Sequence, residues 1–456
     1  MAGIITPVSS PVGPREERFL ETYFSMLGHL AFDRAKEMMD KEKEAHKAFT
    51  AASWGTLVQC LSQFATAERM YLSLTFLEYK RFTGIGRSKE NLRTTYTLLM
   101  QEFRRMEDAT PQTVEITPPS PLPSPASLFA DFDVLVAHLC GQLCHFLSAR
   151  QKMMDFYEQI STMGGHKNMN FEDLATMVNH ITQAHGKAFH HPLLIPLKTL
   201  YSWECDVLGH LLQGQILMAD WQFLPSLLQL HAAHSKLQAW LTAAAVKESK
   251  KAFGGGSKVN AMPLLYHWLA KFKGVLVSKF SVYFHTILSK QSTPNDMKSW
   301  LTKAPEDYFA RIVAFHKKCD AFNISLVLDT NGLGDLYQGP GYHHPDRQAC
   351  IPQGMDSYPA ILSYPGEHPM QHWPNVLMLV TRRVTPSSNS PTHKTNYFYD
   401  VKAQSTYFII QIDPRISLVV IFECKKSEKD SHTNAFLTEF SAQLRSHWIL
   451  GSLKHH

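Results

Sequence analysis

The side chains best able to do chemistry in this 456-residue chain are its 24 histidines and 7 cysteines. Cys140 and Cys144 lie four residues apart with His145 adjacent, and His231 and His234 lie three apart. Such spacings can put two metal ligands on one face of a helix. Each pair lacks a second pair nearby, and Cys140 falls on an apolar helical stripe. We therefore favour buried thiols and exposed or hydrogen-bonded histidines.

Two His-His-Pro triplets, at 190–192 and 343–345, form a repeated local pattern. Because proline forces the preceding residue into an extended conformation, each triplet predicts a change of chain direction with one ring packed and the other exposed. Loop histidines can also converge in space without sequence order. An alternative is therefore a metal site made by His343, His344, His368 and His372.

The sequence contains no complete nucleotide-binding or catalytic motif. The loop GLGDLYQGPG follows an expected strand, but Tyr337 stands where a dinucleotide-binding loop needs glycine. The stretch GGGSK at 254–258 follows a helix and lacks the ending of a phosphate-binding loop. Nucleophile-turn, HExxH and kinase motifs do not occur. We expect no catalytic residue, no cofactor and no bound metal.

Composition narrows the classes of partner. Lys and Arg number 45 against 40 Asp and Glu, and this mild excess is spread along the chain instead of clustered as in nucleic-acid binders. The odd number of cysteines, mostly in apolar segments, favours reduced thiols in a reducing compartment. The N-terminus lacks the pattern of a signal peptide, and no long apolar run occurs, so we expect membrane association only through partners.

The aromatic residues upstream of 375 are the best candidates for a protein-binding surface. Exposed aromatics commonly anchor interfaces, although these could equally fold a long loop onto its own domain. The candidate partner-binding residues are Tyr342, His343, His344, Trp373 and Pro374, with Tyr358 and Tyr364 nearby. The mixed-charge run Lys425–Asp430 could contact an acidic partner or lipid headgroups, but it fits a solvated connection better.

Apolar residues at three- and four-residue spacing predict an all-helical domain over 14–320, after a disordered N-terminus at 1–13. We expect about nine helices in a bundle, near residues 14–47, 53–76, 88–105, 131–157, 170–185, 196–221, 225–250, 263–290 and 305–319. The proline-rich stretch 109–127 predicts an extended linker. It could instead be a ligand for an SH3-like partner.

After residue 320 the hydrophobic period changes to that of strands. Strands are predicted at 323–329, 375–381 and 397–400, followed by a hairpin over 404–423 that turns at Asp413-Pro414-Arg415. A helix over 431–448 could cover one face of this sheet. The predicted fold class is α plus α+β: a helical bundle domain followed by a smaller antiparallel α+β domain over 321–456.

Several stretches resemble one known family, that of the second subunit of the KICSTOR complex. They occur in one order over most of the chain: FHHPLLIPL at 189–197, WQFLPSL at 221–227, HAAHSKLQ at 231–238, KFSVYFH at 279–285, GYHHP at 341–345, HWPNV at 372–376, QSTYF at 404–408 and IFECKKSEKDSH at 421–432.

The resemblance implies a non-enzymatic subunit of a cytosolic scaffold whose other members are kaptin, an FG-GAP propeller subunit and a very large organising subunit. That scaffold holds the GATOR assembly, which activates GTP hydrolysis by Rag GTPases, at the lysosomal surface. It thereby restrains TOR kinase signalling when amino acids or glucose are scarce. The family supplies no catalytic residues, and by analogy of fold its α+β part is similar to longin and roadblock modules of GTPase regulators.

Two other functions stay open at this point. One is a direct regulator of a small GTPase that acts through the α+β domain. The other is a histidine-dependent metal enzyme.

Overall fold

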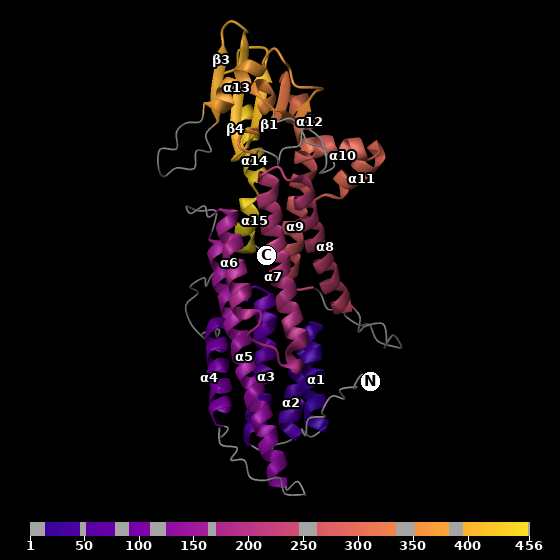
Figure 1. Cartoon of the computed structure of the whole chain (residues 1–456), viewed down its shortest axis with the longest axis vertical. Coiled ribbons are helices and arrows are strands. Elements are labelled where there is room, and N and C mark those ends of the chain that lie inside the picture. The colour runs from indigo at the N-terminus through magenta and orange to yellow at the C-terminus, as the bar shows by residue number, and fades with distance from the viewer. Residues whose placement is uncertain are drawn as a thin grey trace, which may run out of the picture.

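The computed structural model describes residues 14–45, 52–77, 91–109, 125–162, 170–245, 262–333, 352–382 and 395–454. Within them the chain forms a long helical bundle that carries a five-stranded antiparallel sheet at one end (Figure 1). The predicted fold class, helical first and antiparallel α+β second, is confirmed.

The described residues before 319 form twelve α-helices, so the expected count of about nine is too low. They are α1 (Pro14–Gly28), α2 (Phe32–Ala45), α3 (Ala52–Leu72), α4 (Leu92–Asp108), α5 (Pro125–Ser161), α6 (Phe171–His185), α7 (Ile195–Ala219), α8 (Phe223–Ala245), α9 (Leu264–Tyr283), α10 (His285–Gln291), α11 (Pro294–Lys303) and α12 (Tyr308–Lys318). The predicted linker 109–127 falls mostly outside the described residues, and its last three residues begin α5.

The extra helices come from breaks that apolar spacing does not show. The expected helix over 14–47 divides into α1 and α2 because Leu30 adopts a left-handed backbone, with φ of 59°. The helix expected over 263–290 divides at Phe284 into α9 and α10. Helix α11 was not predicted, although Thr293 caps it by accepting a hydrogen bond from the Asp296 amide at 3.2 Å and Pro294 follows the cap.

A charged cluster lies in the middle of the bundle. Arg150 of α5 is fully buried between Glu68 of α3 and Glu204 of α7. Its Nε and Nη2 donate to Glu68 Oε2 at 3.1 and 3.0 Å, and its Nη1 donates to Glu204 Oε2 at 2.6 Å. Burial opposes the charge on Arg150, but the two carboxylates hold its pKa well above the ordinary value.

Three buried tyrosines complete the cluster. Tyr96 of α4 donates to Glu68 Oε1 at 2.7 Å, and Tyr71 and Tyr157 donate to Glu204 Oε1 at 2.6 and 2.9 Å. Each of the four carboxylate oxygens therefore accepts a hydrogen bond, as buried charges require. The cluster therefore links the four helices α3, α4, α5 and α7 through hydrogen bonds.

The sheet has the strand order β2-β1-β5-β4-β3, with every neighbouring pair antiparallel. Its strands are β1 (Asn323–Leu328), β2 (Ala360–Tyr364), β3 (Asn396–Asp400), β4 (Ser405–Asp413) and β5 (Ile416–Phe422). The predicted hairpin is confirmed as β4–β5, in which Phe408 pairs with Val420. Helix α14 (Ser431–Arg445) packs against β4, and the short helix α15 (His447–Gly451) follows it after Ser446.

The strand predicted over 375–381 is wrong, because these residues form helix α13 (Trp373–Thr381). A short apolar run does not distinguish a strand from a buried helix. Pro374 in the first turn fits a helix start, and Trp373, Val376 and Leu379 are buried at helical spacing. The strand that the prediction missed is β2, which pairs with β1 at one edge of the sheet.

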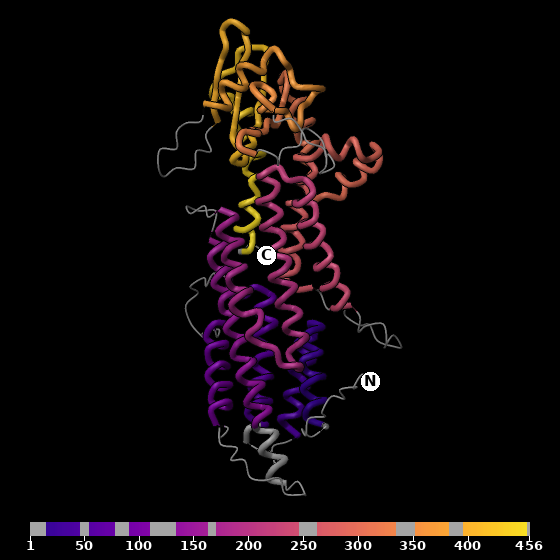
Figure 2. The backbone as a smooth tube through the Cα atoms, in the orientation of Figure 1, coloured from indigo at the N-terminus to yellow at the C-terminus, as the bar shows by residue number. Residues whose placement is uncertain are grey.

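The bundle and the sheet share one hydrophobic core that runs from Leu20 to Leu453. Lys279 of α9 is buried 2.8 Å from Asp413 Oδ2 at the end of β4, and Tyr283 donates to the same oxygen at 2.6 Å. The C-terminal segment turns back along the bundle, as Figure 2 shows, and the Trp268 indole donates to the Ile449 carbonyl at 3.0 Å. The sheet is therefore fixed to the bundle by packing on several elements.

We expect Arg150→Met to lower the free energy of unfolding by about 3–5 kcal/mol, because two buried carboxylates lose their cation. Urea denaturation followed by circular dichroism measures this. Arg93→Met is the matched control: the Arg93 side chain is 36% exposed beside Asp155 and Glu158, and its loss should cost about 0–1 kcal/mol. Equal losses in the two variants would show that the buried cluster does not stabilise the bundle.

Candidate functional site

The predicted partner-binding residues fall in two places. Tyr342, His343 and His344 lie outside the described residues. Trp373 is only 2% exposed, its ring centroid lies 4.3 Å from that of His368, and its indole donates to the Tyr358 carbonyl at 3.2 Å. Pro374, the next residue, is exposed. Trp373 therefore holds α13 in place, and a partner can reach only its neighbours on the surface.

Helix α13 covers one face of the sheet. Val376 and Leu379 pack with Trp373 on a second, smaller core cluster that includes Tyr407, Val419 and Ile421. The opposite face of the sheet belongs to the large core and lies under α14. The sheet is thus covered on both faces, which places its exposed surface on helices and loops.

A chain of polar groups fixes the start of α13 to three strand ends. Asn375 donates to Asp400 Oδ2 at 2.8 Å and lies 3.1 Å from the Tyr407 hydroxyl. That hydroxyl lies 2.8 Å from His372 Nδ1, and His372 Nε2 lies 3.3 Å from Glu423 Oε1. A Tyr-His-Glu series can relay a proton, but burial raises the pKa of the Tyr407 phenol and the side chain is fully buried. The arrangement positions α13 and does not present a reactive group.

The metal hypothesis gains no support from the residues that can be placed. His368 packs on Trp373 and His372 bonds to Tyr407, while His343 and His344 lie outside the described ranges. Within the described ranges, no three histidine, cysteine or acidic side chains lie close enough together to hold an ion.

The interpretation of the paired cysteines and histidines as structural is supported. Cys140 and Cys144 are buried free thiols of α5, and burial raises the pKa of Cys144 to about 11. His231 and His234 are exposed on α8. The predicted chain turn at His190-His191-Pro192 is confirmed: His190 is exposed, whereas His191 is buried and its Nδ1 accepts a hydrogen bond from the Leu193 amide at 3.2 Å.

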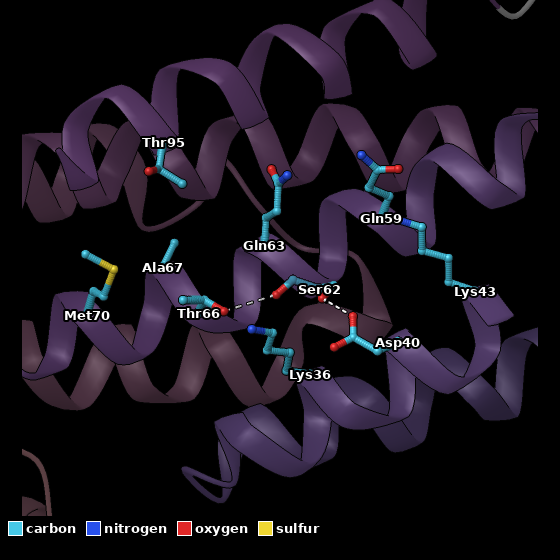
Figure 3. A pocket seen from close by; sticks show the side chains of 10 residues that line it. All are labelled: Lys36, Asp40, Lys43, Gln59, Ser62, Gln63, Thr66, Ala67, Met70 and Thr95. Carbon is cyan, nitrogen blue, oxygen red and sulfur yellow. Dashed lines mark hydrogen bonds between the residues drawn. The ribbon is translucent and has the colours of Figure 1, made fainter. Parts of the chain in front are cut away.

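A surface groove in the helical bundle was not predicted. It has a volume of about 370 Å³, and its floor is α3, flanked by α2 and α4. Figure 3 shows Lys36 and Asp40 of α2 beside Ser62 and Thr66 of α3, with Thr95 of α4 across from them. The Ser62 hydroxyl donates to Asp40 Oδ1 at 2.7 Å. The groove is lined mainly by lysine, amide, hydroxyl and carboxylate side chains, so it suits binding of a polar surface.

Sequence reasoning missed this groove because its residues come from three helices. Each is an ordinary polar residue of a surface helix, and only the packing of α2 and α4 on the two sides of α3 brings them together. Of the helices that the structure describes, none is long and apolar enough to cross a membrane.

These features define a class of protein: a rigid helical bundle, capped by an antiparallel α+β unit, whose reachable surfaces are suited to contact with other proteins. The family model described as "KICSTOR complex C12orf66 like" matches residues 8–456. The chain is 41% identical over 455 residues to "KICSTOR subunit 2" of Xenopus laevis, covering 99% of each chain. It is also 41% identical over 446 residues to the Danio rerio protein of that name, covering 97% of this chain and 96% of the relative. The chain belongs to the KICSTOR C12orf66-like family, as its sequence motifs indicated.

The buried histidine yields a pH prediction. Burial, reinforced by His138 and His190, lowers the pKa of His191 to about 4. In the unfolded chain the pKa of this histidine is about 6.5. Below that pH the ring therefore binds a proton in the unfolded chain but not in the folded chain. The stability contributed by neutral His191 is therefore lost as pH falls from 6.5 towards 4.

We expect His191→Asn, which keeps a side-chain acceptor for the Leu193 amide, to flatten the loss of stability in this range. The difference in the free energy of unfolding should be on the order of 2 kcal/mol between pH 6.5 and 4. Denaturation at a series of pH values measures it. His145→Asn, at an exposed ring on α5, is the control and should follow the wild-type curve. Parallel curves for all three proteins would disprove the assignment.

Proposed function

We propose that this chain is a non-enzymatic scaffold subunit of a KICSTOR complex. The main support is the match to the family over residues 8–456, together with 41% identity to a KICSTOR subunit 2 over 99% of the chain. Because the similarity covers nearly all of both chains, it includes the bundle, the sheet and the C-terminal segment that packs back on the bundle. We infer that the whole molecule, and not one grafted segment, is what the relatives share.

We further propose the partners and the place of action. The partners are the other KICSTOR subunits, namely kaptin, the FG-GAP propeller subunit and the large organising subunit, and through them the GATOR assembly. The site of action is the cytosolic face of the lysosomal membrane, reached through partners. The output is restraint of TOR signalling when amino acids or glucose are scarce. A shared core that fixes the sheet to the bundle suits this role, because it holds separate binding surfaces at fixed positions.

One partner contact is proposed around α13. Pro374 is exposed there and Met370 is 62% exposed, whereas Trp373 between them in the sequence is buried in the core under α13. We also propose Tyr342, His343 and His344, which lie outside the described residues, as partner-binding residues. The alternative function, direct regulation of a small GTPase, would use the same α+β part.

Capture of the tagged full chain from cells tests the proposed function. We expect it to recover the other KICSTOR subunits in defined ratios. Splitting the chain near 320 is unsuitable, because the shared core and the Lys279–Asp413 pair cross that point. Capture that recovers none of the subunits would contradict the proposal. Purified protein that changes GTP hydrolysis or nucleotide exchange by itself would favour the alternative.

A further inference from the structure

Helix α8 lies along one side of the bundle (Figure 1) and has an unusual surface. Its 23 residues include a single charged side chain, Lys236, and that charge is paired with Asp206 of α7 at 2.7 Å. The surface nevertheless exposes Leu224, Leu227, Leu228 and Leu241, and Leu228 is 56% exposed. A helix at the surface of a globular protein ordinarily turns charged and polar residues to water. Three of these leucines gather at the start of α8 and Leu241 lies near its end, with His231, His234, Ser235 and Gln238 exposed between them. Uncovered leucines that lie close together indicate a surface that another chain covers.

Helix α9 extends this surface. It runs antiparallel to α8, because Phe223 packs on Phe280 with ring centroids 5.5 Å apart and Trp240 packs on Tyr266 at 5.8 Å. Leu227 lies one turn along α8 from Phe223, and Val277 lies one turn back along α9 from Phe280. Both side chains are partly open to solvent, at 38% and 37%, on neighbouring turns of two helices that pack together. We define the α8–α9 face by Leu224, Leu227, Leu228, Leu241, Lys273 and Val277.

The charges on this face have one sign. Neither α8 nor α9 contains an aspartate or glutamate. Lys279 is buried against Asp413, but Lys273 is half-buried, and it pairs with no carboxylate among the described residues. Burial lowers the pKa of Lys273, and burial together with the charge of Lys273 lowers the pKa of the neighbouring His234. A partner carboxylate beside Lys273 would supply the opposite charge that this ammonium group lacks.

This charge pattern argues against a second copy of the chain as the occupant. In a symmetric dimer the same patch meets itself, so the face would bring Lys273 towards its own counterpart with no carboxylate from either α8 or α9. Like charges brought together in this way oppose association. A membrane is also a poor fit, because lipid-binding helices carry many Lys and Arg on the polar face and α8 carries only Lys236.

We propose that the α8–α9 face docks an acidic amphipathic helix of another protein. The leucines and Val277 take the apolar stripe of that helix, and Lys273 pairs with a carboxylate on its edge. This is the helix-on-apolar-surface mode of recognition, read by anchors at i, i+3, i+4 and i+7. The inference rests on the proposed function, since it supplies one contact between this scaffold subunit and a partner.

The test compares the full chain carrying Leu228→Glu or Lys273→Glu with the wild type in cellular capture. Each substitution should lower recovery of one KICSTOR or GATOR component by about tenfold or more, as loss of an interface anchor does. Leu98→Glu is the matched control, since Leu98 is 50% exposed on α4, and it should leave recovery unchanged. Thermal unfolding of the purified Leu228→Glu variant should match the wild type because Leu228 is 56% exposed. The melting temperature of Lys273→Glu, whose side chain is half-buried, shows whether that variant is folded before its capture is compared.

A photo-crosslinking residue at position 228 identifies the occupant. We expect residue 228 to crosslink to an acidic segment with apolar residues at helical spacing. That segment should belong to the component whose recovery the two variants lower. A crosslink to a second copy, to residues 246–261 of the same chain or to a basic segment would overturn the proposal. So would binding to phosphatidylserine vesicles that Leu228→Glu abolishes. Wild-type protein that captures no component defeats the proposed function itself, whereas capture that Leu228→Glu and Lys273→Glu leave intact defeats only this docking face.

Discussion

The bundle depends on one fully desolvated cation held between two carboxylates. Arg150, Glu68 and Glu204 lie on three different helices, and each of the four carboxylate oxygens accepts a hydrogen bond. A charge transferred from water to a protein interior is costly unless such bonds replace its hydration. Sliding any one of these helices by a turn would leave a buried charge without a partner. The cluster therefore selects one register among the many that apolar faces alone would allow.

A second buried pair does the same for the junction of bundle and sheet. Lys279 and Tyr283 of α9 both contact Asp413, which ends β4 in the turn of the central hairpin. Helix α14 packs on the hairpin, and after it the chain runs back along the bundle (Figure 2). There the carbonyl of Ile449 accepts a hydrogen bond from the indole of Trp268 on α9. Contacts at both ends of this C-terminal segment prevent the sheet from rotating on the bundle. The consequence is a molecule whose separate surfaces keep a fixed geometry.

Sequence reasoning recovered those parts of the fold that local patterns specify. The β4–β5 hairpin was predictable because β-branched and aromatic runs flank Asp413-Pro414-Arg415, and the turn at His191 because proline restricts the residue before it. Helix α13 was not, since NVLMLVT is apolar enough for either a strand or a helix, and only tertiary packing decides. The groove on α3 and the Arg150 cluster join residues far apart in the chain. Apolar periodicity located α8, but it could not tell which of its leucines other helices would leave uncovered.

The distribution of perturbed groups bears on what kind of function this fold can support. Strongly shifted pKa values often mark active sites. Here burial raises the pKa of Glu68, and it raises the pKa of Tyr96 and of Tyr283, yet all three side chains are closed off from solvent. The reachable surfaces carry lysines, carboxylates, histidines, amides, hydroxyls and uncovered leucines. Recognition at such surfaces depends on shape, apolar area and the sign of a few charges. A rigid core that keeps those surfaces in place is then the feature on which recognition depends.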